Sequence, residues 1–306
     1  MLSGFFTIWV IIGLGWLLAH LRVLREDAQP VLSQVSFFVG APALLFEVMA
    51  DADLGRVFAP HVLVSLAAIM VAGATYLVCD RLWWNTSVGE RVIATFCSAY
   101  VNAGNLGLPI AAYVLGDVTW LAPVLLLQIC VLQPAGLSVL DAQRTRDAGR
   151  APSALRYISM PLRNPLTLGA LTGLVFNLAN LRLPALLAGT VSMLAGLAVP
   201  TMLIAFGVSL RLGQVPRWDA DARRTVVVSF IKVVWMPFVA WLGCVLLGAA
   251  AATTLAVTVM AALPTAQNVY VHSVRYNVAR PLARDAVFIT TFASVPAIAL
   301  IAALLG

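Results

Sequence analysis

Apolar residues in this chain gather into long stretches, and polar residues are confined to the segments between them. Most stretches contain about 20 residues, the length of helix that crosses the hydrocarbon core of a bilayer. The pattern predicts an all-α membrane protein with ten transmembrane helices, numbered here as spans one to ten. The expected spans are residues 3–21, 31–50, 60–79, 91–115, 119–140, 164–181, 185–210, 224–248, 253–275 and 284–305.

Basic residues are distributed unequally between the two sets of alternating connections. Sixteen of the 19 belong to the side that begins with the connection after span one. Arg56 and Arg182 belong to the other side, and Lys232 lies inside span eight. Connections rich in Lys and Arg remain in the cytoplasm. The asymmetry therefore predicts that both termini face outward and that the central connection is cytoplasmic.

One long polar connection, residues 141–163, separates the chain into residues 1–140 and 164–306. Each part holds five spans, so the second part enters the membrane from the opposite side. We expect two inverted five-helix repeats, an arrangement common in secondary transporters. Two proline landmarks agree with this, since Pro42 and Pro200 are 158 residues apart and Pro109 and Pro264 are 155 apart.

Span four carries helix-breaking residues at the depth expected for the bilayer centre. Its segment 102–109 reads NAGNLGLP and includes Asn102, Asn105, Gly104, Gly107 and Pro109. Proline removes a backbone donor and frees the carbonyl four residues earlier, here that of Asn105. Free backbone groups are costly in lipid, so this segment must face protein or water.

Span nine carries the counterpart, because Pro264 is followed closely by Gln267 and Asn268. By the same reasoning Pro264 frees the carbonyl of Met260. In inverted repeats the two breaks cross near the membrane centre and point helix N-termini into the crossing. Such N-termini attract anions.

The crossing therefore predicts a site for a small anion, and the amides near the two breaks are its candidate donors. Gln128 of span five is a further candidate. The alternative interpretation is that these breaks are kinks whose amides join one helix to another. The predicted substrate-binding residues are Asn102, Asn105, Gln128, Gln267 and Asn268.

Both broken segments resemble the crossover regions of the auxin efflux carrier family, which includes plant PIN auxin carriers and bacterial malonate and malate carriers. The resemblance rests on residues 102–109 and 263–277, with weaker likeness at residues 229–241 and at Asn164-Pro165. The resemblance extends over nearly the whole chain, but the matching residues are sparse outside the two broken segments. Where PIN carriers have a second proline in the second crossover, this chain has Val269.

The resemblance implies a ten-helix fold similar to sodium/proton antiporters and bile-acid symporters. It implies a homodimer in which spans 1, 2, 6 and 7 form a scaffold. Spans 3–5 and 8–10 would form a transport domain that moves by an elevator mechanism. It also implies a small carboxylate substrate, a role for Asn102 in binding it, and a place in the bacterial cytoplasmic (inner) membrane.

Three ionisable residues are candidates for coupling transport to an ion. Glu47 and Lys232 lie within predicted spans, where charges are often functional. His272 lies near the inner end of span nine and can titrate near neutral pH. For each residue the alternative is a side chain that extends to the membrane surface. The coupling ion, a proton or sodium, stays open.

Composition excludes several other classes of protein. Hydrophobic residues make up 61% of the chain and charged residues 10%, whereas soluble domains contain about 25% charged residues. The net charge of +6 is spread over membrane-flanking connections rather than over a surface for nucleic acid. We expect no metal, no cofactor and no enzymatic site, because the sequence shows no metal-binding or catalytic motif. The rival functions are a sodium symporter of the same fold and an anion channel.

Overall fold

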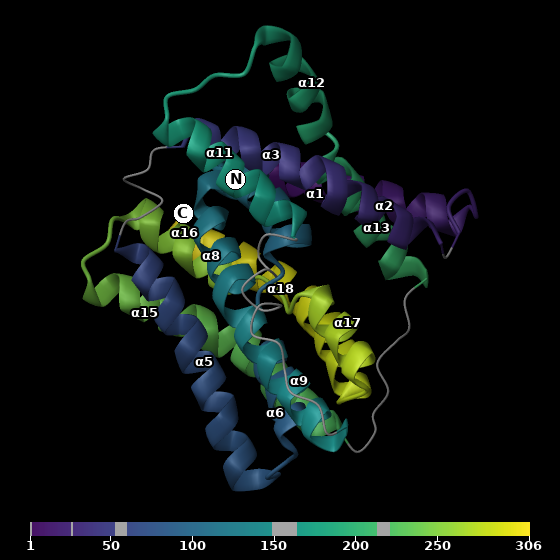
Figure 1. Cartoon of the computed structure of the whole chain (residues 1–306), viewed down its shortest axis with the longest axis vertical. Coiled ribbons are helices and arrows are strands. Elements are labelled where there is room, and N and C mark those ends of the chain that lie inside the picture. Colours follow the sequence, from purple (N-terminus) through teal and green to yellow (C-terminus); the bar gives the residue numbers. More distant parts are fainter. Residues whose placement is uncertain (1, 26, 53–59, 149–163, 213–220) are drawn as a thin grey trace. The chain divides into compact units, whose positions relative to one another are not determined.

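A computed structural model of the chain describes residues 2–25, 27–52, 60–148, 164–212 and 221–306 (Figure 1). These residues form helices and their connections, with one isolated β-bridge. Many of the long helices are assembled from α-helical and π-helical pieces in succession. Mixed helices of this kind occur where a residue interrupts the regular hydrogen-bond ladder, and π-helical turns are frequent at functional sites.

The first part of the chain contains α1 to α9. The π-helical segments are η1, η2, η3 and η5, and η4 is a 3₁₀ turn. In order the elements are α1 (Leu2–His20), α2 (Ala28–Val35), η1 (Ser36–Gly40), α3 (Ala41–Ala50), α5 (His61–Trp83), α6 (Val88–Ala99), η2 (Ala103–Gly107), α7 (Leu108–Ile110), η3 (Ala111–Leu115), η4 (Val118–Leu121), α8 (Ala122–Leu127), η5 (Gln128–Leu132) and α9 (Gln133–Ala148).

The second part contains α11 to α18, with the π-helical segment η7 in its middle. In order the elements are α11 (Pro165–Leu178), α12 (Ala185–Ala195), α13 (Ala198–Leu212), α14 (Ala222–Phe230), η7 (Ile231–Trp235), α15 (Met236–Leu246), α16 (Ala251–Ala261), α17 (Gln267–Tyr276) and α18 (Arg280–Leu305).

Six helical stretches among the described residues are long and apolar enough to cross a membrane. They are Ala28–Ala50, His61–Trp83, Val118–Gln143, Ala185–Leu212, Ala222–Leu246 and Arg280–Leu305. Four shorter apolar helices lie in the remaining predicted spans, at Phe6–His20, Ala103–Leu115, Pro165–Leu178 and Ala251–Ala261. The all-helical membrane fold expected from the sequence is thus confirmed, whereas the count of ten membrane crossings stays a prediction.

The chain forms two compact units, each assembled from three separate segments. Unit 1 contains residues 1–59, 104–126 and 160–214, and unit 2 contains residues 60–103, 127–159 and 215–306. The boundary between them divides span four just after Ala103. Each unit is described below by itself.

Unit 1 is held together by two helix pairs, α1 with α13 and α11 with α3 (Figure 1). Glycine permits close backbone approach in both. A Cβ atom on Gly15 of α1 would lie 2.9 Å from the Cα atom of Ile204 of α13, and one on Gly169 of α11 would lie 2.8 Å from the Cα atom of Pro42 of α3. Small residues allow such approach in membranes, where helices associate through van der Waals contact.

The helices of unit 2 are α5, α6, α9, α14, α15, α16, α17 and α18, with the π-helical segments η5 and η7. Helix α5 packs against α6 and α15, α15 packs against α16, and α14 packs against α18. At one end of this unit, Arg91 Nε lies 2.7 Å from a carboxylate oxygen of the buried Asp80, and Ser87 begins α6 with a capping box that includes Glu90. The ion pair with Arg91 compensates the charge of the Asp80 carboxylate, which is buried near the end of α5.

The polar connection expected at residues 141–163 stays a prediction, and its first residues are helical. Helix α9 continues to Ala148, so residues 141–148 are helical. Helix formers such as Ala142, Gln143 and Arg144 continue the helix past the last apolar residues. The rest of the expected connection, residues 149–163, lies outside the described residues.

Candidate functional site

The interrupted segments of spans four and nine meet inside unit 2. Val101 and Thr265 form an antiparallel β-bridge. The N–H of Asn102 donates to the carbonyl of Pro264 at 2.7 Å, and the N–H of Ala266 donates to the carbonyl of Tyr100 at 3.2 Å. Each extended segment thus supplies the hydrogen bonds that the other loses by leaving the helix. We call residues 100–102 and 262–266 the paired breaks.

Gln128 holds the side of Val101 that faces away from the bridge. The Val101 N–H donates to Gln128 Oε1 at 2.6 Å, and Gln128 Nε2 donates to the Val101 carbonyl at 3.1 Å. The Gln128 side chain is buried, with 2% of its surface exposed. One amide therefore satisfies both backbone groups of the residue at the centre of the bridge. Its predicted contact with a substrate stays a prediction.

Threonine hydroxyls hold the other side of the paired breaks. Thr265 Oγ1 donates to the carbonyl of Cys97 at 2.5 Å, and the Thr265 N–H donates to Thr290 Oγ1 of α18 at 3.0 Å. Thr265 and Thr290 are both fully buried. Buried backbone groups need such partners because an unpaired one costs about 1–3 kcal/mol.

Lys232 holds the end of α16. Its Nζ donates to the carbonyl of Ala261 at 2.8 Å and lies 3.2 Å from the Met236 sulfur, and the side chain is fully buried. It therefore extends into unit 2 rather than to the membrane surface. The carbonyl of Met260, expected to be freed by Pro264, instead accepts the N–H of Leu263 at 3.4 Å. That expectation is wrong because α16 ends before Pro264, so Ala261 is the residue whose carbonyl needs a side-chain donor.

The interruption of span four lies earlier than its proline. Residues 100–102 leave the helix, whereas residues 103–115 are helical again through η2, α7 and η3. Pro109 is the second residue of α7 and lies inside this continuous helical segment. Gly104 and Gly107 lie in η2, before it. The wider turns on both sides of α7 accommodate the missing N–H of Pro109.

Helix α17 starts directly after the second of the paired breaks, and Gln267 and Asn268 are its first residues. Asn268 Nδ2 donates to Gln133 Oε1 at 3.5 Å, and the Tyr100 hydroxyl donates to the same oxygen at 3.1 Å. Asn268 Oδ1 is buried and has no hydrogen-bond partner among the described residues. The start of α17 thus presents amide groups that can bind a polar ligand.

Unit 2 holds four of the five predicted substrate-binding residues. Asn102 is 5% exposed and belongs to the paired breaks, close in sequence to Val101, which Gln128 binds. Gln267 and Asn268 are half-buried at the start of α17. The fifth, Asn105, lies in η2, within unit 1. The predicted role of all five in binding a substrate is taken up below.

The remaining candidates lie elsewhere. Glu47 is half-buried in α3 of unit 1. His272 lies in α17 of unit 2, and its Nε2 atom is buried without a partner among the described residues. Across the same residues, no cluster of three or more His, Cys, Asp or Glu side chains could hold a metal ion.

Sequence reasoning missed three of the residues that hold the paired breaks, namely Thr265, Thr290 and Gln133. A signal existed for Thr265, which follows Pro264 directly, and for Gln133, a second amide in an otherwise apolar span. Thr290 gave no signal, because threonines are common in membrane helices and can bond their own helix, as Thr290 also does to Ala286.

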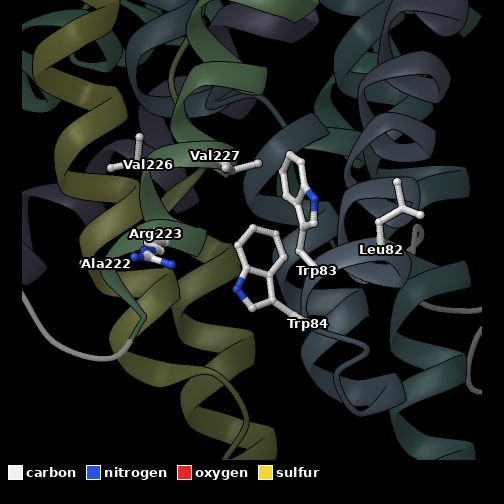
Figure 2. A pocket seen from close by; sticks show the side chains of 7 residues that line it. All are labelled: Leu82, Trp83, Trp84, Ala222, Arg223, Val226 and Val227. Carbon is white, nitrogen blue, oxygen red and sulfur yellow. The ribbon is translucent and has the colours of Figure 1, made fainter.

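A cavity of about 800 Å³ lies in unit 2, where α5 ends and α14 begins (Figure 2). Trp83 and Trp84 face α14 across it, and the Arg223 guanidinium lies on its far side. Indole rings with a single arginine are typical of the membrane–water interface rather than of a polar substrate site. The lining residues are Leu82, Trp83, Trp84, Ala222, Arg223, Val226 and Val227.

Comparisons with known proteins agree on one class. A family model described as "Membrane transport protein" matches residues 2–145 and 153–302. The chain is 28% identical over 291 residues to a Rhizobium meliloti (strain 1021) protein named "Putative malonate transporter". The alignment covers 93% of this chain and 89% of that protein. The chain is also 26% identical over 293 residues to an "Uncharacterized transporter" of Methanothermobacter thermautotrophicus (strain Delta H). That alignment covers 94% of this chain and 93% of the other protein.

Proposed function

The chain belongs to the membrane transport protein family, the auxin efflux carrier family, and from this premise we propose that it is a secondary transporter of a small carboxylate. Its membership and its apolar helices make it a multi-pass membrane transporter. The substrate class is the proposed part. One similar protein is named for malonate, a short dicarboxylate.

The observation that carries the proposal is the pairing of the two breaks. Non-helical backbone at membrane depth is found where it lines a cavity or is buried in protein, and broken helices of transporters commonly bind the substrate. Here α17 begins at the break with Gln267 and Asn268, whose amides can donate to a carboxylate. The first N–H groups of α17 add a partial positive charge. We propose that Asn102, Gln267 and Asn268 bind the substrate, with Asn105 and Gln128 as further candidates.

Helix pairing within unit 1 supports the proposal that the protein is built from two inverted five-helix repeats. Helix α1, the first of one half, packs against α13 of the other half, and α11, the first of the second half, packs against α3 of the first. Span one thus packs on span seven, and span six, its equivalent in the second half, packs on span two. Repeats related by symmetry require such equivalent pairs. We propose ten spans with both termini outside the cytoplasmic membrane, as the charge asymmetry predicts.

The division into two units supports an elevator mechanism. Unit 1 contains spans one, two, six and seven, proposed as the dimer scaffold, together with residues 104–126. Unit 2 contains spans three, eight and ten, the paired breaks and most of span five. We propose that the scaffold forms a homodimer and that unit 2 carries the substrate when it moves.

Uptake into proteoliposomes tests the proposal. Purified protein is reconstituted, and entry of labelled malonate, malate and indole-3-acetate is measured with and without pH and sodium gradients. Saturable uptake of one acid is expected, and gradient dependence identifies a proton or sodium as the coupling ion. Asn102→Ala is expected to reduce uptake roughly tenfold or more, because a hydrogen bond to a charged group contributes about 1.5–3 kcal/mol.

Thr190→Ala serves as the matched control, since Thr190 is exposed on α12 and bonds only its own helix. Uptake by this variant should equal that of the original chain. A strict requirement for sodium would instead identify a sodium symporter, and non-saturating flux without countertransport would identify a channel. If none of the acids enters, the substrate class is wrong.

A further inference from the structure

The cavity beside Trp83 and Trp84 is separate in sequence and in lining from the paired breaks. It lies between the end of α5 and the start of α14. Helix α5 and the continuous helical stretch Ala222–Leu246, which begins with α14, are each long and apolar enough to cross a membrane. Leu82 and Trp83 are exposed over 71% and 63% of their surface, so the cavity opens at the side of the molecule. Its position at two helix ends is the level of the lipid headgroups.

Two neighbouring arginines of α14 differ in burial and in ion pairing. Arg224 is buried, and its guanidinium lies 3.0 Å from Asp221 and 3.5 Å from both Glu90 and the Tyr76 hydroxyl. Arg223 is exposed and lines the cavity (Figure 2), and no ion-pair partner for it exists among the described residues. The cavity therefore offers one uncompensated positive charge beside an apolar wall.

We propose that this cavity binds an anionic phospholipid of the cytoplasmic leaflet. Arg223 would pair with the phosphate, and Trp83, Trp84 and Val226 would contact the glycerol region and the first acyl carbons. Basic pockets between transmembrane helices on the cytoplasmic side recognise anionic headgroups in this way. In the topology proposed from the charge asymmetry, with both termini outside, these helix ends lie on that side. The occupant is thus anionic at one end and apolar at the other.

Lipid retention measured by native mass spectrometry tests this proposal without any transport assay. The detergent-purified full chain is delipidated and titrated with phosphatidylglycerol or with phosphatidylcholine of the same acyl chains. Phosphatidylglycerol should bind at least fivefold more tightly. Arg223→Gln should abolish this preference, and Trp83→Leu should weaken binding of both lipids about threefold. Both side chains are exposed, so neither variant should unfold the protein.

Arg182→Gln is the matched control, because it removes the same charge from an exposed position in the opposite set of connections. This variant should keep the preference for phosphatidylglycerol. The proposal is overturned if the two lipids bind equally, or if Arg223→Gln and Arg182→Gln behave alike, since binding would then reflect net charge alone. Transport of carboxylates has no part in either outcome.

Discussion

The two units are stabilised by different kinds of interaction. In unit 1, backbones touch directly: a Cβ on Gly40 would lie 2.6 Å from the Ala198 nitrogen, and one on Gly173 would lie 3.0 Å from the Phe46 Cα atom. In unit 2, the buried side chain of Gln128 binds backbone groups of Val101 that have left the helix, and the buried Lys232 binds the carbonyl at the end of α16. Unit 1 thus contains the closest backbone contacts, with side-chain bonds from Ser36 and Asn177 beside them, whereas unit 2 holds the buried side chains that bind the paired breaks.

The difference follows from the number of backbone N–H and C=O groups that lack a partner within their own helix. Continuous helices satisfy their own hydrogen bonds, so packing alone decides how they associate in lipid. Interrupted helices expose N–H and C=O groups, and each needs a partner from another element. Unit 2 supplies these partners from spans five, eight and ten, which ties the paired breaks to three other helices. Substitutions that act on one kind of interaction should leave the other unit unaffected.

The largest effect is expected for Gln128→Leu. Leucine fills a similar volume but leaves the buried Val101 N–H without a partner and removes one of the two hydrogen bonds to the Val101 carbonyl, which keeps the Ala103 N–H at 2.8 Å. An unsatisfied buried group costs about 1–3 kcal/mol and a lost hydrogen bond about 1 kcal/mol, so the variant should lose about 3 kcal/mol of stability, seen as a lowered Tm in detergent. Gln128→Glu keeps an acceptor for the N–H and should lie between the two. Equal Tm values for the original chain and both variants would show that the paired breaks do not need the Gln128 amide.

Gly15→Leu should have the next largest effect, and Gly13→Leu is its control on the same helix. A side chain on Gly15 meets the backbone of Ile204, whereas nothing lies within 4 Å of the Cβ position of Gly13. Overpacking costs about 1–3 kcal/mol, so only the Gly15 variant should show a lower Tm and reduced yield of folded protein. Comparable losses in both variants would mean that α1 and α13 do not touch in this way.

Thr265→Val should have the smallest effect. Valine keeps the shape of threonine and removes only the hydrogen bond to the Cys97 carbonyl, worth about 1 kcal/mol. In unit 1, Thr172→Val removes a hydroxyl that bonds its own helix at the surface, and the Tm should stay unchanged. The comparison fails if the surface substitution destabilises the protein as much as the buried one.

Much of the fold was accessible from the sequence because lipid imposes strong rules on it. Long apolar stretches and the distribution of arginine follow directly from solvation. Helix-breaking residues likewise marked spans four and nine as interrupted. The positions of the breaks were less accessible: Pro109 lies inside a continuous helical segment, and residues 100–102, which carry no proline, leave the helix. A proline shows where a backbone N–H is missing. The hydrogen-bond partners on neighbouring segments decide where the chain leaves the helix.

By itself, the sequence determined that this protein is a helical membrane protein with candidate breaks in spans four and nine, because apolar length and local backbone chemistry are properties of adjacent residues. Its resemblance to the auxin efflux carrier family indicated a transporter. Only the tertiary structure decided that Val101 pairs with Thr265, that Gln128 binds the backbone and that Lys232 is buried against Ala261. These contacts join residues from different spans. Their geometry depends on which helices lie side by side, which no local pattern specifies.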